Sequence, residues 1–424
     1  MLNFSPNDSS THESSGLASN HLKSAVAQSA QQQVISNDKK TTADDENLDS
    51  IVSPSQSFFI ERTLRVAEGN VEECGRPFAC LIVDPATNTI LSETGNRVAQ
   101  TCDPTAHAEV LGIRLAAEAL KQKRTDITAK ALFNLDFYIM ASPCPMCFGA
   151  MYLCAPRSVI FITTREFYSI YYSDPRKYIT FNEFYGEFTK DFSQRRLPTK
   201  QFLQQTLQNE AMQIIKLWRE IKDNGGVSTA MTTERAASSN DVTLDNNSDG
   251  DSLSSRWFYR VLDLARANVV LRGGRPFACV IARGNELIAE SADQVDELCD
   301  PTAHAEMQAI RIASQKLRSE HMYDVQIYSL AMPSPMSIGA MYYCSPSQLV
   351  FLVHPSLYEP FYQEPAAPKV PKLCDLYLEY GRNNDDRIMK MNQVEDEIIR
   401  EKGLEVYRRW FQINIEATKQ TLAN

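Results

Sequence analysis

Four side chains in the first half of the sequence could hold a metal ion and move protons beside it. His107 and Glu109 lie in the run T-A-H-A-E, and Cys144 and Cys147 lie in the run P-C-P-M-C. One imidazole and two thiolates supply three ligands of a tetrahedral zinc, which leaves the fourth position open, as in catalytic rather than structural sites. Glu109 lies two residues from the histidine and would remain free to transfer protons. The spacing therefore predicts a catalytic zinc centre with a carboxylate base.

Both ligand segments are predicted to lie at the starts of helices. Asp103 and a proline precede an apolar-periodic run over 106–120, and Pro143 opens a second helix. The positive end of a helix favours thiolate over thiol, which prepares the cysteines for a cation. Taken singly, the histidine and the cysteines could be core residues, and Glu109 could serve the helix dipole. Taken together at this spacing, they favour zinc binding and proton transfer.

The first half otherwise alternates short apolar runs with amphipathic stretches. We expect a helix at its start, a β-hairpin about a P-A-T-N-T turn, two further strands and a late helix. In chain order these elements are expected at 56–71, 78–83, 90–93, 137–141, 158–162 and 214–221.

The motifs of the first half recur in the same order in the second half. The repeated runs are G-R-P-F-A-C (75–80 and 274–279), C-D-P-T-A-H-A-E (102–109 and 299–306) and G-A-M-Y (149–152 and 339–342). Eight identical residues in a row within one motif make a chance resemblance negligible. The chain is therefore interpreted as a tandem duplication.

The two copies differ at the predicted metal ligands. Where the first copy has Cys144 and Cys147, the second has Ser334 and Ser337. A serine hydroxyl stays protonated at neutral pH and is a poor zinc ligand, and His304 alone cannot hold a catalytic zinc. We therefore expect a single Zn²⁺ per chain, in the N-terminal domain only, and a second domain that keeps the fold without its metal.

These motifs carry a resemblance to a known family. On H-A-E at 107–109, P-C-P-M-C at 143–147 and F-G-A-M-Y at 148–152, the sequence resembles the cytidine-deaminase-like superfamily, and within it the guanine and guanosine deaminases. The resemblance covers 56–225 and 255–424. It implies two tandem three-layer α/β/α domains, each with a mixed sheet of about five strands. It also implies zinc-dependent hydrolysis of guanine to xanthine and ammonia, with Glu109 as the catalytic residue.

The same resemblance indicates where a base would bind. Asn96, seven residues before Asp103, stands where guanine deaminases hold the base, and an amide can both donate to and accept from a purine edge. Phe78 could flank the ring, and Asp174 lies near the place of an acidic residue that contacts the base in guanine deaminases. Each of the three residues could also have a purely structural role. Asn96 could be a turn residue, Phe78 a core residue, and Asp174 part of a turn before proline. The second copy has Asp293 in place of Asn96.

Two other functions remain open at this stage. One is a tRNA-editing adenosine deaminase with a built-in inactive partner domain, since D-P-T-A-H-A-E also occurs in those enzymes. The other is a non-catalytic regulatory or scaffold protein, against which the intact first-copy motif argues. The net charge of −10 disfavours general nucleic-acid binding, which depends on Lys and Arg neutralising phosphates. A local basic patch would still permit RNA as a partner.

Composition divides the chain into four parts. Residues 1–54 are rich in Ser, Asn, Gln and Asp, and are predicted to form a disordered tail. Residues 226–254 have a similar composition and are predicted to form a flexible linker. They separate the catalytic domain at 55–225 from the zinc-less domain at 255–424.

We expect the two domains to pair within one chain, since guanine deaminases resemble domain-swapped dimers. The C-terminal end, from about Trp410, would then reach the first active site, and further association of chains remains open. The sequence has no apolar run of about 18 residues and no secretory signal, so we expect no membrane partner. Ten cysteines, two of them in C-x-x-C, fit a reducing compartment. The expectation is a cytoplasmic enzyme with a small-molecule purine substrate.

Overall fold

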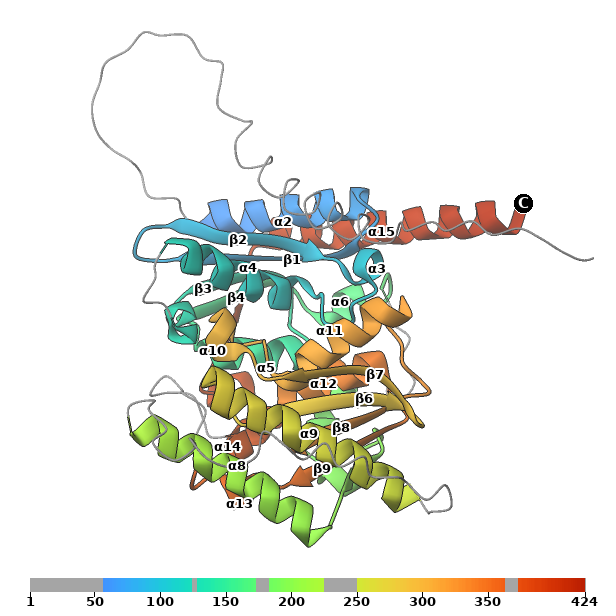
Figure 1. Ribbon diagram of the computed structural model, residues 1–424. Helices are drawn as coiled ribbons and strands as arrows, with labels where there is room; N and C mark the ends of the chain where they lie inside the picture. The colour runs from blue at the N-terminus through green and yellow to red at the C-terminus, as the bar shows by residue number, and fades with distance from the viewer. Residues whose placement is uncertain (1–55, 124–127, 173–182, 225–249, 363–372, 424) are drawn as a thin grey trace, which may run out of the picture. The chain divides into compact units, whose positions relative to one another are not determined.

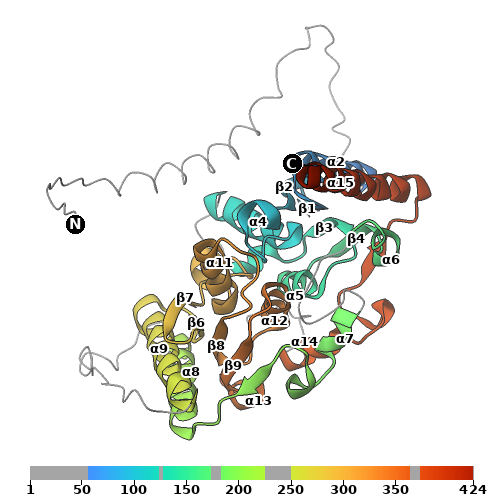
Figure 2. The ribbon, with the colours of Figure 1, turned by 90° about the vertical axis from the view of Figure 1, so that its right-hand side faces the viewer.

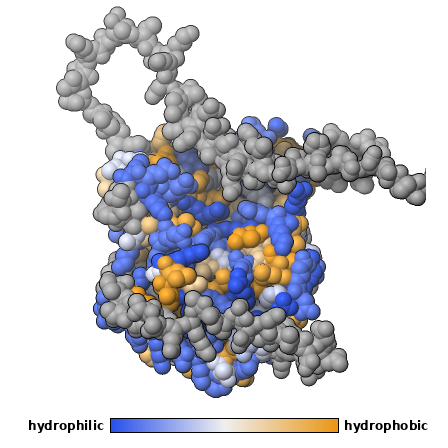
Figure 3. All heavy atoms as spheres, in the orientation of Figure 1, coloured by the Kyte–Doolittle hydropathy of each residue, from blue (hydrophilic) through white to orange (hydrophobic). Residues whose placement is uncertain are grey.

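The computed structural model describes residues 56–123, 128–172, 183–224, 250–362 and 373–423. The predicted tail, Asp174 and most of the predicted linker lie outside these ranges. Within them, no helix is long and apolar enough to cross a membrane. On the face seen in Figure 1, polar side chains cover most of the described surface, with apolar patches between them (Figure 3).

The first half contains the elements that its sequence predicts, most of them within a few residues at each end (Figure 1). The late helix is the exception, because it begins at Gln205 rather than near the predicted residue 214. In chain order they are α2 (Gln56–Glu72), β1 (Arg76–Asp84), β2 (Thr89–Asn96), α3 (Val98–Thr101), α4 (Ala108–Lys123), η1 (Ala129–Leu132), β3 (Asp136–Ala141), α5 (Pro145–Cys154), β4 (Ser158–Thr163), α6 (Arg165–Tyr168), α7 (Phe184–Phe188), η3 (Phe192–Gln194), β5 (Thr199–Gln201) and α8 (Gln205–Asp223).

The second half repeats this order. Its elements are α9 (Gly250–Arg272), β6 (Ala278–Arg283), β7 (Glu286–Ala292), α10 (Val295–Leu298), α11 (Ala305–Leu317), β8 (Gln326–Ala331), α12 (Pro335–Cys344), β9 (Gln348–Val353), α13 (Pro355–Tyr358), α14 (Leu373–Glu379), η4 (Asn384–Asp386), β10 (Met391–Gln393) and α15 (Glu397–Ala423). Helix α9 begins at Gly250, inside the stretch predicted as linker. Polar Asp251 and Ser252 form its first turn, ahead of the buried Trp257 and Phe258.

Two mixed five-stranded sheets confirm the predicted α/β architecture. The first sheet has the order β10-β4-β3-β1-β2 and the second has the order β5-β9-β8-β6-β7. In the first, β10, β4 and β3 are parallel, whereas β1 runs antiparallel to both β3 and β2. Helices α2 and α15 cover one face of this sheet, and α4 and α5 cover the other (Figure 1). The second sheet lies in the same way between α8 and α9 on one face and α11 and α12 on the other, so each sheet is the middle layer of three.

The last strand and helix of each half are exchanged. Strand β10 pairs with β4, with Met391 opposite Val159, although the two residues come from different copies. Strand β5 pairs in the same way with β9, with Thr199 opposite Leu349. The helices follow their strands, because α15 packs on α2 and α8 packs on α9. The predicted boundaries at 225 and 255 therefore separate the two sequence repeats. They do not separate the two folded sheets with their helices, because residues 199–223 of the first repeat complete the second sheet.

Helices α5 and α12 hold the two halves together between the sheets. Figure 2 shows them side by side, and the buried apolar core around them contains residues of both copies. Two glycines permit the close approach. A Cβ on Gly339 would lie 2.6 Å from the Cα of Met146, and a Cβ on Gly149 would lie 2.8 Å from the backbone nitrogen of Met336. The backbones themselves are in contact, so neither position has room for a side chain.

We expect Gly339→Ala to destabilise the protein by about 1–3 kcal/mol, because the added methyl group meets backbone that cannot move aside. Gly69→Ala in α2 is the matched control, since a Cβ added there would have nothing within 4 Å of it. That helical substitution should stabilise the protein by about 0.5–1 kcal/mol. Urea unfolding measures both changes. If the two variants were equally stable, the contact between α5 and α12 would not be the tight constraint described.

Candidate metal and catalytic site

The structure brings His107, Cys144 and Cys147 together. The His107 Nδ1 atom lies 3.6 Å from the Sγ atom of each cysteine, and the three possible ligand atoms lie within 4.8 Å of one another. Tetrahedral zinc, about 2.0–2.1 Å from nitrogen and about 2.3 Å from sulfur, places its nitrogen and sulfur ligands about 3.5 Å apart. The two nitrogen–sulfur distances therefore match those of a zinc site. Across the described ranges, no other three His, Cys, Asp or Glu residues form such a group.

The starts of two helices position these ligands. His107 immediately precedes α4, and Cys144 is the N-cap of α5. The Cys144 sulfur accepts a hydrogen bond from the Cys147 backbone N–H at 3.5 Å, and Pro145 occupies the first helical turn, where it needs no N–H partner. Tyr185 donates to the carbonyl of Pro143 at 2.8 Å and so fixes the preceding loop. The cysteine pair is held by the helix backbone itself.

Glu109 lies in the first turn of α4, beside the ligand group. Its Oε2 atom accepts a hydrogen bond from the Cys147 thiol at 3.3 Å, and the residue is only 8% exposed. Burial and the charge of Cys144 raise the pKa of this carboxyl above its ordinary value, although His107 opposes the shift. A carboxyl of this kind takes up and releases protons closer to neutral pH than an exposed one does.

The two cysteines have opposite tendencies to ionise. Burial opposes ionisation of Cys144, but hydrogen bonding from Cys147 and the charge of His107 hold the pKa of its thiol well below the ordinary value. Burial and the adjacent Cys144 raise the pKa of the Cys147 thiol well above it. The first proton thus leaves from Cys144, and a cation is needed to stabilise both thiolates together.

The predicted base-binding residues lie at the ends of neighbouring strands. Asn96 ends β2 and is 1% exposed, and its Oδ1 atom accepts from the backbone N–H of Val98 at 3.2 Å. Phe78 lies in β1 and makes edge-to-face contacts with Tyr172 at 4.9 Å and with Tyr407 at 5.4 Å between ring centroids. Asp174 lies outside the described residues.

Two tyrosines near the ligand group escaped the sequence reasoning, and both belong to the second half. Tyr343 of α12 places its ring 4.5 Å from the imidazole of His107, at an interplanar angle of 67°. Tyr407 of α15 stacks on Tyr168 at 4.7 Å, and the charge of Glu109 contributes to the raised pKa of its phenol, after burial and Tyr168. Its buried hydroxyl interacts with the side chain of Thr163, which acts to lower the pKa of the phenol.

A comparison of the two copies could have marked both tyrosines. Counting back from Trp410 and Trp218, the counterpart of Tyr407 is Ile215, and the run G-A-M-Y is followed by Tyr343 in one copy and by Leu153 in the other. What the sequence could not give is their location, because both contact residues of the other half.

The corresponding place in the second half is filled by hydroxyl groups. Glu306 accepts hydrogen bonds from Ser329 at 2.6 Å and from Ser337 at 3.2 Å. The hydroxyls of Ser334 and Ser337 lie 3.2 Å apart. The carboxylate is therefore satisfied by hydroxyl donors, and the group contains no thiolate.

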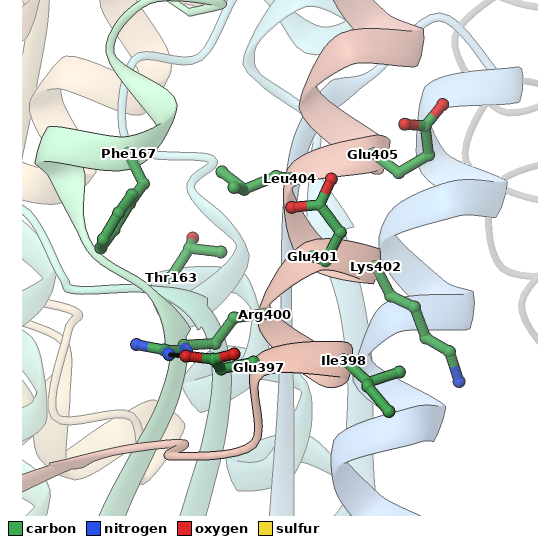
Figure 4. A pocket seen from close by; sticks show the side chains of 9 residues that line it. All are labelled: Thr163, Phe167, Glu397, Ile398, Arg400, Glu401, Lys402, Leu404 and Glu405. Atoms are coloured by element: carbon green, nitrogen blue, oxygen red, sulfur yellow. Dashed lines mark ion pairs between the residues drawn. The ribbon is translucent and has the colours of Figure 1, made fainter.

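A hollow of about 680 Å³ lies elsewhere, between the start of α15, α6 and the end of β4 (Figure 4). Its lining includes Thr163, Phe167 and Leu404 together with charged residues of α15. None of the four candidate catalytic residues lines it. The hollow is thus distinct from the ligand group.

Comparisons with known proteins agree with this geometry. The family model described as "Cytidine and deoxycytidylate deaminase zinc-binding region" matches residues 53–163 and 252–353. A guanine deaminase of Bacillus subtilis is 33% identical over 163 residues, which cover 38% of this chain and 92% of that protein. A tRNA-specific adenosine deaminase of Agrobacterium fabrum is 33% identical over 96 residues, which cover 23% of this chain and 57% of that protein.

Among solved structures, the X-ray structure of guanine deaminase from Bacillus subtilis is similar to this chain. It has 26% sequence identity and a TM-score of 0.31, with 35% of this chain and 88% of that chain covered. The family match includes both copies, so it spans the ligand group of the first half and the serines of the second. The exchanged segments from β5 to α8 and from β10 to α15 lie outside it.

Proposed function

The chain belongs to the cytidine and deoxycytidylate deaminase family, and on that premise we propose that its first half is a zinc-dependent hydrolase that converts guanine to xanthine and ammonia. The observation that carries the proposal is the buried group of one imidazole and two sulfur ligands, each sulfur 3.6 Å from the imidazole nitrogen, with a carboxylate beside it. The similarity to a guanine deaminase over 92% of that protein supports guanine as the substrate.

His107, Cys144 and Cys147 would hold the zinc. When bound, zinc supplies the acidity that makes water a competent nucleophile near neutral pH. Glu109 is the group proposed to move protons: its Oε2 atom takes one from the attacking water and delivers it to a ring nitrogen of the base. It then takes a second proton from the hydroxyl that has been added to the ring carbon and gives it to the leaving amine, which departs as ammonia. The raised pKa of Glu109 suits a carboxyl that must be protonated and deprotonated within one turnover.

Three further side chains are proposed to bind the base. The Oδ1 atom of Asn96 is occupied by the Val98 N–H, so its amide nitrogen is the atom proposed to donate to a purine acceptor. Phe78 offers an aromatic ring, and the buried hydroxyl of Tyr407 offers a second polar contact. Asp174 stays a proposal from the resemblance alone. Because Tyr407 comes from the exchanged helix α15, the base pocket would be built from both halves.

We expect Glu109→Gln to lower kcat by a factor of about 100 or more, because the amide cannot take a proton from water. Zinc content should not change, since Glu109 is not a ligand. Glu306→Gln is the matched control in the second half and should leave activity unchanged. The measurement is ammonia release. Undiminished turnover by the Glu109 variant would remove this residue from the mechanism.

The substrate is tested by ammonia release from guanine, guanosine, adenine, adenosine, cytosine, cytidine and an unmodified tRNA. Release from guanine alone is the expected result, and release from guanosine alone would move the substrate to the nucleoside. Release only from tRNA would favour the second candidate function, an editing adenosine deaminase. The similarity to a tRNA-specific adenosine deaminase over 96 residues is the observation that favours this candidate. Silence on every substrate without bound zinc would favour the scaffold reading.

We expect the purified chain to contain a single zinc ion, because only the first half retains both thiolates. Cys144→Ser with Cys147→Ser should remove it. Ser334→Cys with Ser337→Cys should create a second site with His304, since the backbone of α12 repeats that of α5. Elemental analysis after dialysis counts the metal. A second zinc in the unmodified protein would contradict the assignment of the metal to the first half.

A further inference from the structure

The aromatic neighbour of His107 comes from the half that lacks the metal ligands. Tyr343 is 5% exposed and approaches the imidazole of His107 edge to face, with ring centroids 4.5 Å apart. Its hydroxyl also makes a hydrogen bond with the Cys144 sulfur, in which the phenol O–H donates. One side chain of the second half thus touches two of the three candidate ligands in the first half.

The surrounding structure fixes Tyr343 in this position. Its backbone carbonyl oxygen lies 3.3 Å from the Nδ1 atom of His321, and its ring lies 5.6 Å from that of Phe184. The close contact of Gly339 with the backbone of Met146 holds α12 against α5, one turn away from Tyr343. The phenol is therefore preorganised before any ligand arrives.

The two copies differ at this position within an otherwise identical run. Residues 149–154 read G-A-M-Y-L-C and residues 339–344 read G-A-M-Y-Y-C, so Leu153 is the counterpart of Tyr343. The preceding tyrosines keep matching roles, because Tyr152 donates to Glu379 and Tyr342 donates to Glu187. The hydroxyl is therefore present only in the copy whose residue contacts His107, and the counterpart in the other copy is an apolar leucine.

We propose that Tyr343 is a positioning residue of the metal centre, so that the half without metal ligands completes the active site of the other half. Its ring holds the imidazole of His107 in place, and its hydroxyl donates to the Cys144 thiolate and withdraws negative charge from the sulfur. Hydrogen bonds of this kind orient metal ligands and tune the metal that they hold. The inference rests on the proposed zinc site at His107, Cys144 and Cys147.

The test replaces the native metal with cobalt(II), which reports directly on its sulfur ligands through thiolate-to-metal charge-transfer absorption. In Tyr343→Phe the thiolate loses its donor and becomes richer in electrons, so the charge-transfer band should shift to lower energy. Zinc affinity, measured by competition with a chelating dye, should fall about 10-fold to 100-fold. Tyr343→Leu, which copies Leu153, removes the ring as well and should cause a larger loss of affinity.

Tyr328→Phe is the matched control. It removes another buried hydroxyl of the second half, which donates to Gln326 at 2.7 Å in β8. This variant should leave both the cobalt spectrum and the zinc affinity unchanged, whatever it does to thermal stability. A loss of stability in Tyr343→Phe with an unshifted band and unchanged affinity would overturn the positioning role, because a purely structural tyrosine predicts that result.

The same experiment separates this inference from the proposed function. A wild-type protein with a thiolate–cobalt band that Tyr343→Phe does not alter would overturn the inference and leave the zinc site standing. A wild-type protein with no such band would overturn the zinc site itself, and the inference with it. A shifted band in Tyr343→Phe, with Tyr328→Phe unchanged, would support both.

Discussion

The contact between α5 and α12 is the constraint on which the rest of the molecule depends. At Gly149 and Gly339 the two helices touch through their backbones, with no room for a side chain at either position. Tyr380 of the second half strengthens the contact by donating to the carbonyl of Pro145 at 2.8 Å. Since Pro145 is adjacent to Cys144, the first turn of α5 is supported by the other copy. The ligand group is therefore a product of the pairing as much as of its own half.

The exchange of β10 and α15 adds a second dependence of the first half on the second. Helix α15 supplies Val406 and Tyr407 to the core that lies between the first sheet and α2. Without this segment, β4 would be an open edge and that core would be exposed on one side. The same argument holds for β5 and α8 in the second sheet. Each half supplies part of the core of the other, so the described chain from α2 to α15 is best regarded as one cooperative structure.

The sequence predicts the local structure well, and the family resemblance led us to expect that the two copies pair, but neither indicates which strands are exchanged. The spacing of His107, Glu109 and the two cysteines was enough to predict a metal site, because helix starts bring such residues together over short stretches of chain. The alternation of apolar residues placed β1 to β4 within a few positions. The exchange was beyond reach in detail, since β5 and β10 have three residues each and could complete either sheet.

Tyr343 and Tyr407 escaped prediction for the same physical reason. Their positions near the ligand group follow from contacts between residues more than 200 positions apart in the sequence, and no local periodicity encodes such contacts. Helix α9 begins at residue 250, before the predicted end of the linker at 254, because the polar first turn of a helix has a composition similar to that of a linker. The comparison of the two copies in the sequence marked Ser334 and Ser337 as departures from the repeated pattern. The same comparison, carried further along the helix, would also have marked Tyr343.

Joining the two copies in one chain has a consequence for how such a site can evolve. In a dimer of identical subunits, every substitution occurs twice, and a residue that improves one site by reaching across the interface must appear beside both. Covalent linkage removes that symmetry, so one copy can lose its thiolates while gaining a tyrosine that serves the other. It also makes the pairing unimolecular, and a site assembled in this way does not come apart on dilution. The two halves of this chain can therefore specialise for different roles, whereas two identical subunits of a symmetric dimer cannot.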